Sequence, residues 1–188
     1  MVELNNYLKE YFNFTESEIN KVLEYVYPIN LEKGEYFLKE GQICKFVAFQ
    51  SRGTIIYYEN KEGEEKVCDF AFENDWISQL DSFTNNRPSK MNIKAIENTS
   101  LWAISKNDLE KIKKKVLKMN TLQTSVTEGL FIKANNRISN FTNLTAKERY
   151  HKEIKENPKL IQRIPQYYLA SYLGIKPQSL SRIRSEKI

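Results

Sequence analysis

The arrangement of apolar and polar positions divides the chain into a helical start, a β-rich middle and a helical last third. Between residues 5 and 27, apolar side chains recur mostly at the spacing of a helix. Thr15 and Glu18 match a capping box, in which a hydroxyl and a carboxylate each bind a backbone N–H where a helix begins. One or two short helices are therefore expected before Pro28.

Short runs of β-branched and aromatic residues follow Pro28 and are separated by turn residues. The predicted strands are residues 36–39, 46–50, 54–59, 65–72, 90–97 and 101–104. Residues 60–63, Asn-Lys-Glu-Gly, predict a hairpin between two of them, and residues 98–100 predict a turn between the last two. Strands this short and this closely spaced favour an antiparallel roll or barrel that closes on itself.

Helical spacing returns after Ser105, where apolar residues follow at steps of three and four from Leu109 to Leu130. Residues 120 and 121 are expected to divide this stretch into a short helix and a long one. The apolar stripe has two interpretations, the seam of a dimer or a face packed on the β-rich part, and we favour the seam. A second capping box, Thr145 with Glu148, predicts a further helix that ends near Pro158.

Residues 165–185 carry the most specific pattern in the chain. Pro165 and Pro177 each suit the first position of a helix, and Gly174 between them supplies the backbone angles of a tight turn. Ala170 is small enough for the two helices to approach each other closely. The residues expected to form the small core between these helices are Leu169, Leu173, Ile175, Leu180 and Ile183. The pattern predicts a helix-turn-helix.

Polar side chains remain for the outer side of the second helix once this apolar face is buried. Arg182 can donate two hydrogen bonds to guanine, Gln178 can pair with adenine, and hydroxyls with Lys176 and Arg184 can hold phosphates. The predicted DNA-binding residues are Lys176, Pro177, Gln178, Ser179, Ser181, Arg182 and Arg184. The alternative is a helical hairpin that serves only in protein contacts.

The distribution of charge favours DNA binding. Residues 133–188 hold 12 Lys and Arg against 4 Asp and Glu, whereas residues 1–132 hold 17 against 20. The net charge of +5 over 188 residues is therefore carried by the last third of the chain. A cationic end of this kind is typical of polyanion binding, with a lysine-rich solvated surface as the alternative.

The composition argues against a membrane protein, a metalloprotein and an enzyme. No run approaches the roughly 20 apolar residues that cross a bilayer, and the N-terminus has no signal-like segment, so we expect a cytoplasmic protein. One histidine, His151, and two cysteines, Cys44 and Cys68, are too few for a metal or iron–sulfur site. The cysteines are expected to be reduced strand residues. Asp75 and Asp81, the one carboxylate pair an enzyme could use, are interpreted as solvated loop acids.

Several motifs resemble the Crp/Fnr family of bacterial transcription regulators, and the resemblance covers nearly the whole chain. Residues 31–41, with glycines at 34 and 41, resemble the opening of its cyclic-nucleotide-binding roll, and residues 95–99 resemble the closing strands. Residues 170–174 with 180–183 are the most specific part. The resemblance implies an α+β fold with an N-terminal antiparallel β-roll of jelly-roll type, a long dimerisation helix and a C-terminal helix-turn-helix. The expected division is 1–115, 116–142 and 143–188.

The resemblance also implies a homodimer that places two recognition helices in successive major grooves of double-stranded DNA, on an approximately palindromic operator. RNA polymerase is a candidate partner. Gln178 departs from the acidic residue common at its position, so the operator sequence cannot be carried over. The sequence stops at Ile188, so the β-hairpin wing that relatives place after the recognition helix is expected to be absent.

The nucleotide pocket departs from the family pattern. Residues 75–83 lack the family's Gly-Glu pair, and the phosphate-binding arginine position falls on Asn86 or, after a one-residue shift, on Arg87, with Pro88 after it. A buried phosphate needs a fixed positive partner or several backbone donors, so cyclic AMP is not expected to be the effector. The candidate effector pocket consists of Ser78, Gln79, Asp81, Asn86, Arg87 and Ser89. Another small molecule, or no effector, remains open.

Overall fold

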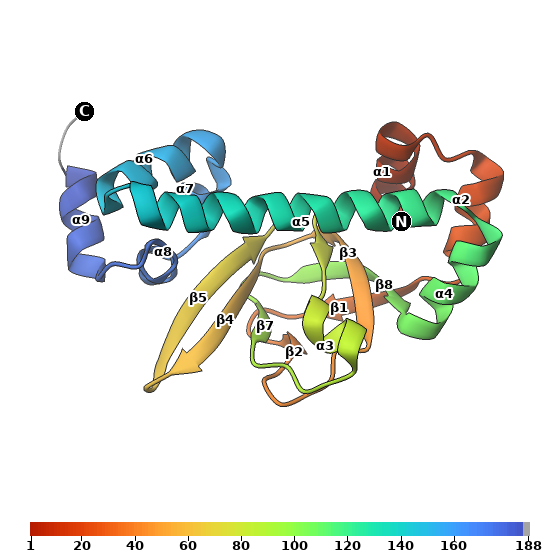
Figure 1. Cartoon of the computed structure of the whole chain (residues 1–188), viewed down its shortest axis with the longest axis horizontal. Coiled ribbons are helices and arrows are strands. Elements are labelled where there is room, and N and C mark those ends of the chain that lie inside the picture. Colours follow the sequence, from red (N-terminus) through yellow and green to blue (C-terminus); the bar gives the residue numbers. More distant parts are fainter. Residues whose placement is uncertain (186–188) are drawn as a thin grey trace. The chain divides into compact units, whose positions relative to one another are not determined.

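The computed structural model describes residues 1–185 and has an α+β fold (Figure 1). Two compact units divide these residues. The roll unit comprises residues 1–57 and 70–127, and the helical unit comprises residues 58–69 and those from 128 onward. Two neighbouring strands and the longest helix contribute residues to both units.

Two four-stranded sheets form the centre of the fold, in the orders β1-β8-β3-β6 and β2-β7-β4-β5. The strands found in residues 1–185 are β1 (Tyr27–Leu31), β2 (Tyr36–Leu38), β3 (Phe46–Arg52), β4 (Ile55–Lys61), β5 (Glu64–Ala71), β6 (Trp76–Ile77), β7 (Asn92–Ala95) and β8 (Thr99–Ser105). Pairing is antiparallel between β1 and β8, β8 and β3, β3 and β6, and β2 and β7. The predicted antiparallel β-roll and its hairpin are confirmed.

The sequence pattern missed β1, β6 and the short helix α3 (Leu80–Asn85). Pro28 weakens the strand signal of β1, but the strand lies at the edge of its sheet, where proline is tolerated. Strand β6 has two residues and α3 has six, so neither is long enough to show a period. The predicted turn at residues 98–100 was wrong at its end, because β8 already begins at Thr99.

Two N-terminal helices, α1 (Val2–Phe12) and α2 (Glu16–Leu23), precede the sheets. The predicted capping box is confirmed: Thr15 Oγ1 accepts from Glu18 N at 3.3 Å, and the Glu18 carboxylate accepts from Thr15 N at 2.8 Å. The Tyr7 ring of α1 lies 5.0 Å from that of Phe49 on β3. This aromatic contact joins α1 to the core, where Phe49 is fully buried.

The helical stretch after β8 divides into a short helix, α4 (Lys106–Lys115), and a long one, α5 (Lys118–Asn143), as predicted. The break lies at residues 116–117, so its predicted position at residues 120–121 was wrong. Val116 has an extended backbone with φ −132° and turns its side chain into the core of the roll unit. Met119 and Leu122, the next apolar residues of the stripe, are buried in the same core. This half of the stripe is therefore a packed face, and the predicted dimer seam is wrong for these residues.

The helical unit is built around four shorter helices, α6 (Ala146–Glu156), α7 (Lys159–Arg163), α8 (Gln166–Leu173) and α9 (Pro177–Ser185). Thr145 Oγ1 accepts from Glu148 N, and the Glu148 carboxylate accepts from Thr145 N at 2.8 Å, so the second capping box is confirmed. Helix α6 ends at Glu156, directly before the predicted end at residues 157–158. The sequence pattern did not predict α7.

No helix in residues 1–185 combines the length and the apolar character needed to cross a membrane. The same residues contain no cluster of His, Cys, Asp or Glu that could hold a metal ion. Both cysteines are free, and Cys44 lies in the loop before β3 rather than in a strand. The expectation about a wing concerns chain beyond α9, which lies outside the described residues.

Candidate nucleic-acid interface

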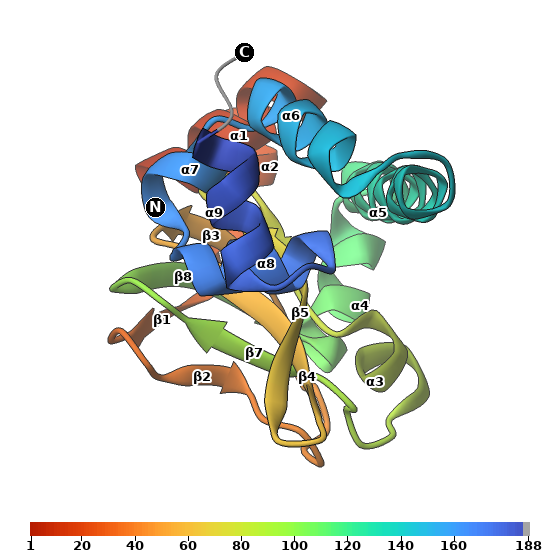
Figure 2. The ribbon, with the colours of Figure 1, turned by 90° about the vertical axis from the view of Figure 1, so that its left-hand side faces the viewer.

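Helices α8 and α9 form the predicted helix-turn-helix, and Gly174 makes the turn (Figure 2). Gly174 has φ +70°, a left-handed conformation that other residues adopt only with strain. Its N–H donates to Ser171 O, and Ile175 N donates to Ala170 O, both at 3.0 Å, which satisfies carbonyls at the end of α8. A Cβ at Gly174 would lie 2.9 Å from Cε1 of Phe141. Backbone angle and close approach therefore both require glycine here.

Apolar contacts hold α8 against α9 as the sequence predicts. Ala170 is fully buried, which lets the two helices approach, and Ile175 is half-buried in the turn. The other buried members of this core are Leu169, Leu173, Leu180 and Ile183. Pro177 is the first residue of α9, where its missing N–H costs no helical hydrogen bond, while Pro165 stands one residue before α8.

The predicted DNA-binding residues lie on the outer side of α9 and the turn. Ser179 is half-buried, and the exposed members are Lys176, Pro177, Gln178, Ser181, Arg182 and Arg184. Among residues 1–185, no carboxylate lies within ion-pair distance of Lys176, Arg182 or Arg184. The charge of Lys176 acts on Glu64, whose pKa is lowered chiefly by the hydrogen bond from Lys66 and to a lesser degree by Lys176. The cations of this helix are thus open to an outside anion.

Ser171, for which the sequence predicts no role, joins α8 to β5 within the helical unit. Its Oγ accepts from Val67 N at 2.9 Å and donates to Glu65 O at 3.0 Å. A hydroxyl on a predicted helix carries no signal that would identify such a partner. Burial of Tyr168 on the same helix raises the pKa of its phenol, with Tyr167 and Glu65 adding to the effect.

The candidate effector residues gather around α3, and internal contacts engage them. Gln79 Oε1 accepts from Ser82 N at 2.6 Å at the start of α3, and Asn86 ends the helix with φ +55°. Ser78 Oγ donates to Phe46 O at 3.2 Å. Ser89 Oγ donates to Met91 O at 2.8 Å. These side chains are used to build the loop.

Arg87, the candidate phosphate ligand, faces a carboxylate of its own chain. Its Nε donates to Asp81 Oδ1 at 3.0 Å, and this hydrogen bond is the main reason why the pKa of Asp81 is lowered. Asn85 donates to the same carboxylate at 2.7 Å. Asp75, the other acid of this region, accepts from Phe72 N at 2.8 Å in a turn. The two aspartates therefore have structural partners, and the Arg87 guanidinium is paired with Asp81.

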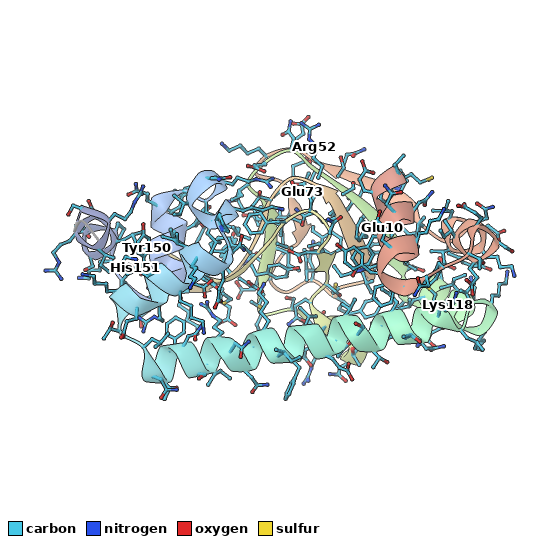
Figure 3. All side chains as sticks on the ribbon, turned by 90° about the horizontal axis from the view of Figure 1, so that it is seen from above. Glu10, Arg52, Glu73, Lys118, Tyr150 and His151 are labelled. Carbon is cyan, nitrogen blue, oxygen red and sulfur yellow. The ribbon has the colours of Figure 1, made fainter. Side chains whose placement is uncertain are left out.

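The single histidine, His151, lies beside Tyr150 on α6, with ring centroids 5.4 Å apart (Figure 3). It belongs to no group of three or more His, Cys, Asp or Glu side chains within residues 1–185 that could hold a metal ion. This position gives no support to a haem or metal role.

Comparison with known proteins agrees with this geometry. Residues 28–115 match the cyclic nucleotide-binding domain family. No curated protein matches the sequence. FixK2 from Bradyrhizobium japonicum has a similar structure, with a TM-score of 0.72 and 18% identity over 86% of this chain and 83% of its own.

A CooA mutant from Carboxydothermus hydrogenoformans gives a TM-score of 0.74 at 15% identity, over 95% of this chain and 83% of its own. A transcriptional regulator of the Crp/Fnr family from Eubacterium rectale gives 0.72 at 16% identity, over 95% and 85%. Residues 28–115 are therefore similar to cyclic nucleotide-binding domains, and the chain has the fold seen in the Crp/Fnr regulators.

Proposed function

We propose that this chain is a sequence-specific, DNA-binding transcription regulator of the Crp/Fnr type that acts in the cytoplasm. The observation that carries the proposal is the outer side of α9, where exposed cations without an ion-pair partner in residues 1–185 follow a glycine turn. Helices presented in this way fit the major groove of double-stranded DNA. The proposed division of the chain is a sensor domain at 1–115, a dimerisation helix at 116–142 and a DNA-binding domain at 143–188.

Each predicted DNA-binding residue of α9 and of the turn before it has a role that its chemistry suggests. Arg182 donates two hydrogen bonds to guanine, and Gln178 pairs with adenine. Phosphate contacts come from Lys176, Arg184 and the two serine hydroxyls, at Ser179 and Ser181. Pro177 fixes where the helix begins.

A second copy of the chain completes the regulator. Phe131 and Ile138 on α5 are 70% and 66% exposed, which is costly for side chains of this size in a monomer. With Ala134 they follow steps of three and four residues, the spacing of a seam between two helices. A homodimer through this face would present two copies of α9 to an approximately palindromic operator.

Cyclic AMP is not the effector in this proposal. The proposal is supported by the Asp81 carboxylate, because it neutralises Arg87 and would repel a bound phosphate at the same place. A different small molecule is a candidate effector, RNA polymerase is a candidate partner, and no metal or cofactor is invoked.

The test is selection of bound duplexes from a random pool by the full-length protein, with and without a metabolite extract. We expect an approximately palindromic site, and an affinity that falls steeply with salt because several phosphate contacts are lost together. Failure to bind any duplex at low salt would contradict the proposal and favour a module that acts through protein contacts. A rise in affinity on adding cyclic AMP would contradict the part concerning the effector.

A further inference from the structure

Two arginines from different helices meet at the C-terminal end of α8. Arg137 of α5 donates from Nη2 to Tyr172 O at 2.9 Å, and Arg149 of α6 donates from Nη2 to Leu173 O at 3.0 Å. Carbonyls in the last turn of a helix have no partner within the helix and carry partial negative charge. The end of α8, directly before the turn at Gly174, is therefore held by cations of two neighbouring helices.

Aromatic rings fill the space between these guanidiniums. The Arg137 guanidinium lies 3.9 Å from the ring centroid of Tyr172 and 4.9 Å from that of Phe141. Arg149 lies 4.5 Å from the centroid of Phe141. Planar guanidinium groups stack on aromatic faces in a way that an ammonium group cannot reproduce. We call Arg137, Phe141, Arg149 and Tyr172 the arginine brace.

The brace also contacts the turn and the start of α6. The ring of Phe141 is the group that a Cβ at Gly174 would meet, so it supports the backbone of the turn. Arg149 Nη1 donates to Leu144 O at 2.6 Å, in the link between α5 and α6. Both arginines are half-buried, and neither has a carboxylate within ion-pair distance in residues 1–185. Carbonyls and ring faces, rather than ion pairs, therefore fix their positions.

We infer that Arg137 and Arg149 are positioning residues for operator binding. They touch no DNA, but they fix the angle of α8, and through three residues of turn the angle of α9, against the end of α5. Ile138, the neighbour of Arg137, lies on the exposed face assigned above to the dimer. One helix then carries both the dimer seam and the brace, so the geometry of the dimer sets the separation of the two recognition helices. The inference rests on the proposed function.

The dependence of affinity on the separation of the two half-sites tests the inference. A variant that only lowered the stability of the protein would not change this dependence. A loosened α9 can still follow one half-site, because the whole protein can rotate on the duplex. It cannot bind two half-sites on a stiff duplex with the same precision. Loss of the brace should therefore weaken binding to two half-sites and relax the preference for their separation.

The experiment uses the full chain as wild type, Arg137→Lys, Arg149→Lys and, as a matched control, Arg52→Lys. Arg52 is exposed at the end of β3 and belongs neither to the brace nor to α9 (Figure 3). Affinities are measured for the selected palindrome, for the palindrome with one half-site randomised, and for palindromes with one base pair added or removed between the half-sites. Lysine keeps the charge and most of the length but removes the stacking plane.

We expect each brace variant to lose about tenfold in affinity for the intact palindrome and less than about twofold for the single half-site. The penalty for changed spacing should shrink in both variants and stay at the wild-type value in Arg52→Lys. An equal loss on one and two half-sites, or an unchanged spacing penalty, would overturn the inference. Thermal melting checks folding, and the second variant carries the test if the first melts below the assay temperature. A wild-type chain that binds no duplex would instead reject the proposed function.

Discussion

Helices α4 and α9 are both rich in cations but use them in opposite ways. Lys111 and Lys113 of α4 form ion pairs with acids three residues earlier, at 2.8 and 2.9 Å. Lys106 Nζ donates to the carbonyls of Phe83 and Thr84 in the last turn of α3. Lys115 Nζ lies 5.0 Å from the ring centroid of Tyr25. Lys114 alone among the lysines of this helix is exposed without a partner in residues 1–185. Most cations of α4 therefore already have a partner within the roll unit.

The cations of α9 have no comparable partners. The helix itself contains no Asp or Glu, and Arg182 and Arg184 lie exposed without ion pairs to any part of residues 1–185. Charge density in the sequence therefore does not identify a nucleic-acid surface. What distinguishes the two helices is whether the folded chain already supplies the anions.

The largest expected effect comes from removing the charges of α9 and of the turn before it, and those of α4 for comparison. We expect Lys176→Ala, Arg182→Ala and Arg184→Ala together to weaken operator binding about a thousandfold, since base and phosphate contacts are both lost. The matched variant changes Lys111, Lys113 and Lys114 of α4 to alanine and should leave affinity within about twofold. Binding to the selected duplex by fluorescence anisotropy measures both. Comparable losses in the two variants would show that the unpaired charges of α9 have no special role.

The second prediction keeps every charge of α9 and changes only the position of the helix. Gly174→Ala places a Cβ at φ +70° and 2.9 Å from Phe141, so α9 should lose its position and operator affinity should fall about 10- to 100-fold. Affinity for random duplexes should fall much less, because the cations remain. Gly129→Ala is the control, since a Cβ there meets nothing within 4 Å and alanine favours the helix by about 0.5–1 kcal/mol. An equal loss on specific and random DNA would contradict this reading.

A third, smaller effect separates base reading from phosphate contact within α9. Arg182→Ala should relax the base preference at one operator position by about 1–3 kcal/mol, whereas Lys176→Ala should weaken all sequences alike. Parallel selection with each variant gives the preference at every position. Equal loss on operator and random DNA for Arg182→Ala would remove it from the base-reading role.

The parts of the fold that the sequence predicts are those set by apolar periodicity and by residues that begin or end an element. Two capping boxes, the hairpin at residues 60–63 and Gly174 each act through neighbouring backbone atoms, and each is confirmed. The predicted position of the α4–α5 break was wrong because burial of Val116 in the core overrides the local preference of residues 120–121. The seam predicted for the stripe through Met119 and Leu122 is wrong, because packing on the roll unit and packing on a second copy require the same apolar residues.

In the candidate site, too, the features set by local spacing were predicted, and the contacts between distant residues were not. The outward face of α9 follows from helical spacing, and Lys176, Gln178 and Arg182 are exposed as expected. The brace contacts of Arg137 and Arg149 link residues up to 35 positions apart, and a single sequence carries no signal for such pairs. The hydrogen bond from Arg87 to Asp81 was not predicted either, because the sequence pattern did not predict α3, the helix that carries Asp81.

The smallest prediction extends the comparison to pH. Lys118 at the start of α5 continues the basic run of α4, and its Nζ donates to Glu18 at 2.8 Å. This hydrogen bond is the largest of the causes that lower the pKa of Glu18 from 4.5 to about 2, with Thr15 N–H next. Because folding favours the charged carboxylate, the stabilisation is complete above the ordinary pKa and fades as pH falls from about 4.5 to about 2.

The difference in thermal midpoint between wild type and Glu18→Gln should therefore be present at about pH 7 and shrink by about pH 2.5. The difference between wild type and Arg182→Gln should not change with pH over this range, because no carboxylate of residues 1–185 pairs with Arg182. A Glu18→Gln difference that persists in acid would mean that shape rather than charge makes the contact. In that case the charge of Lys118, although it lies 2.8 Å from Glu18, would add no more to stability than the unpaired charges of α9.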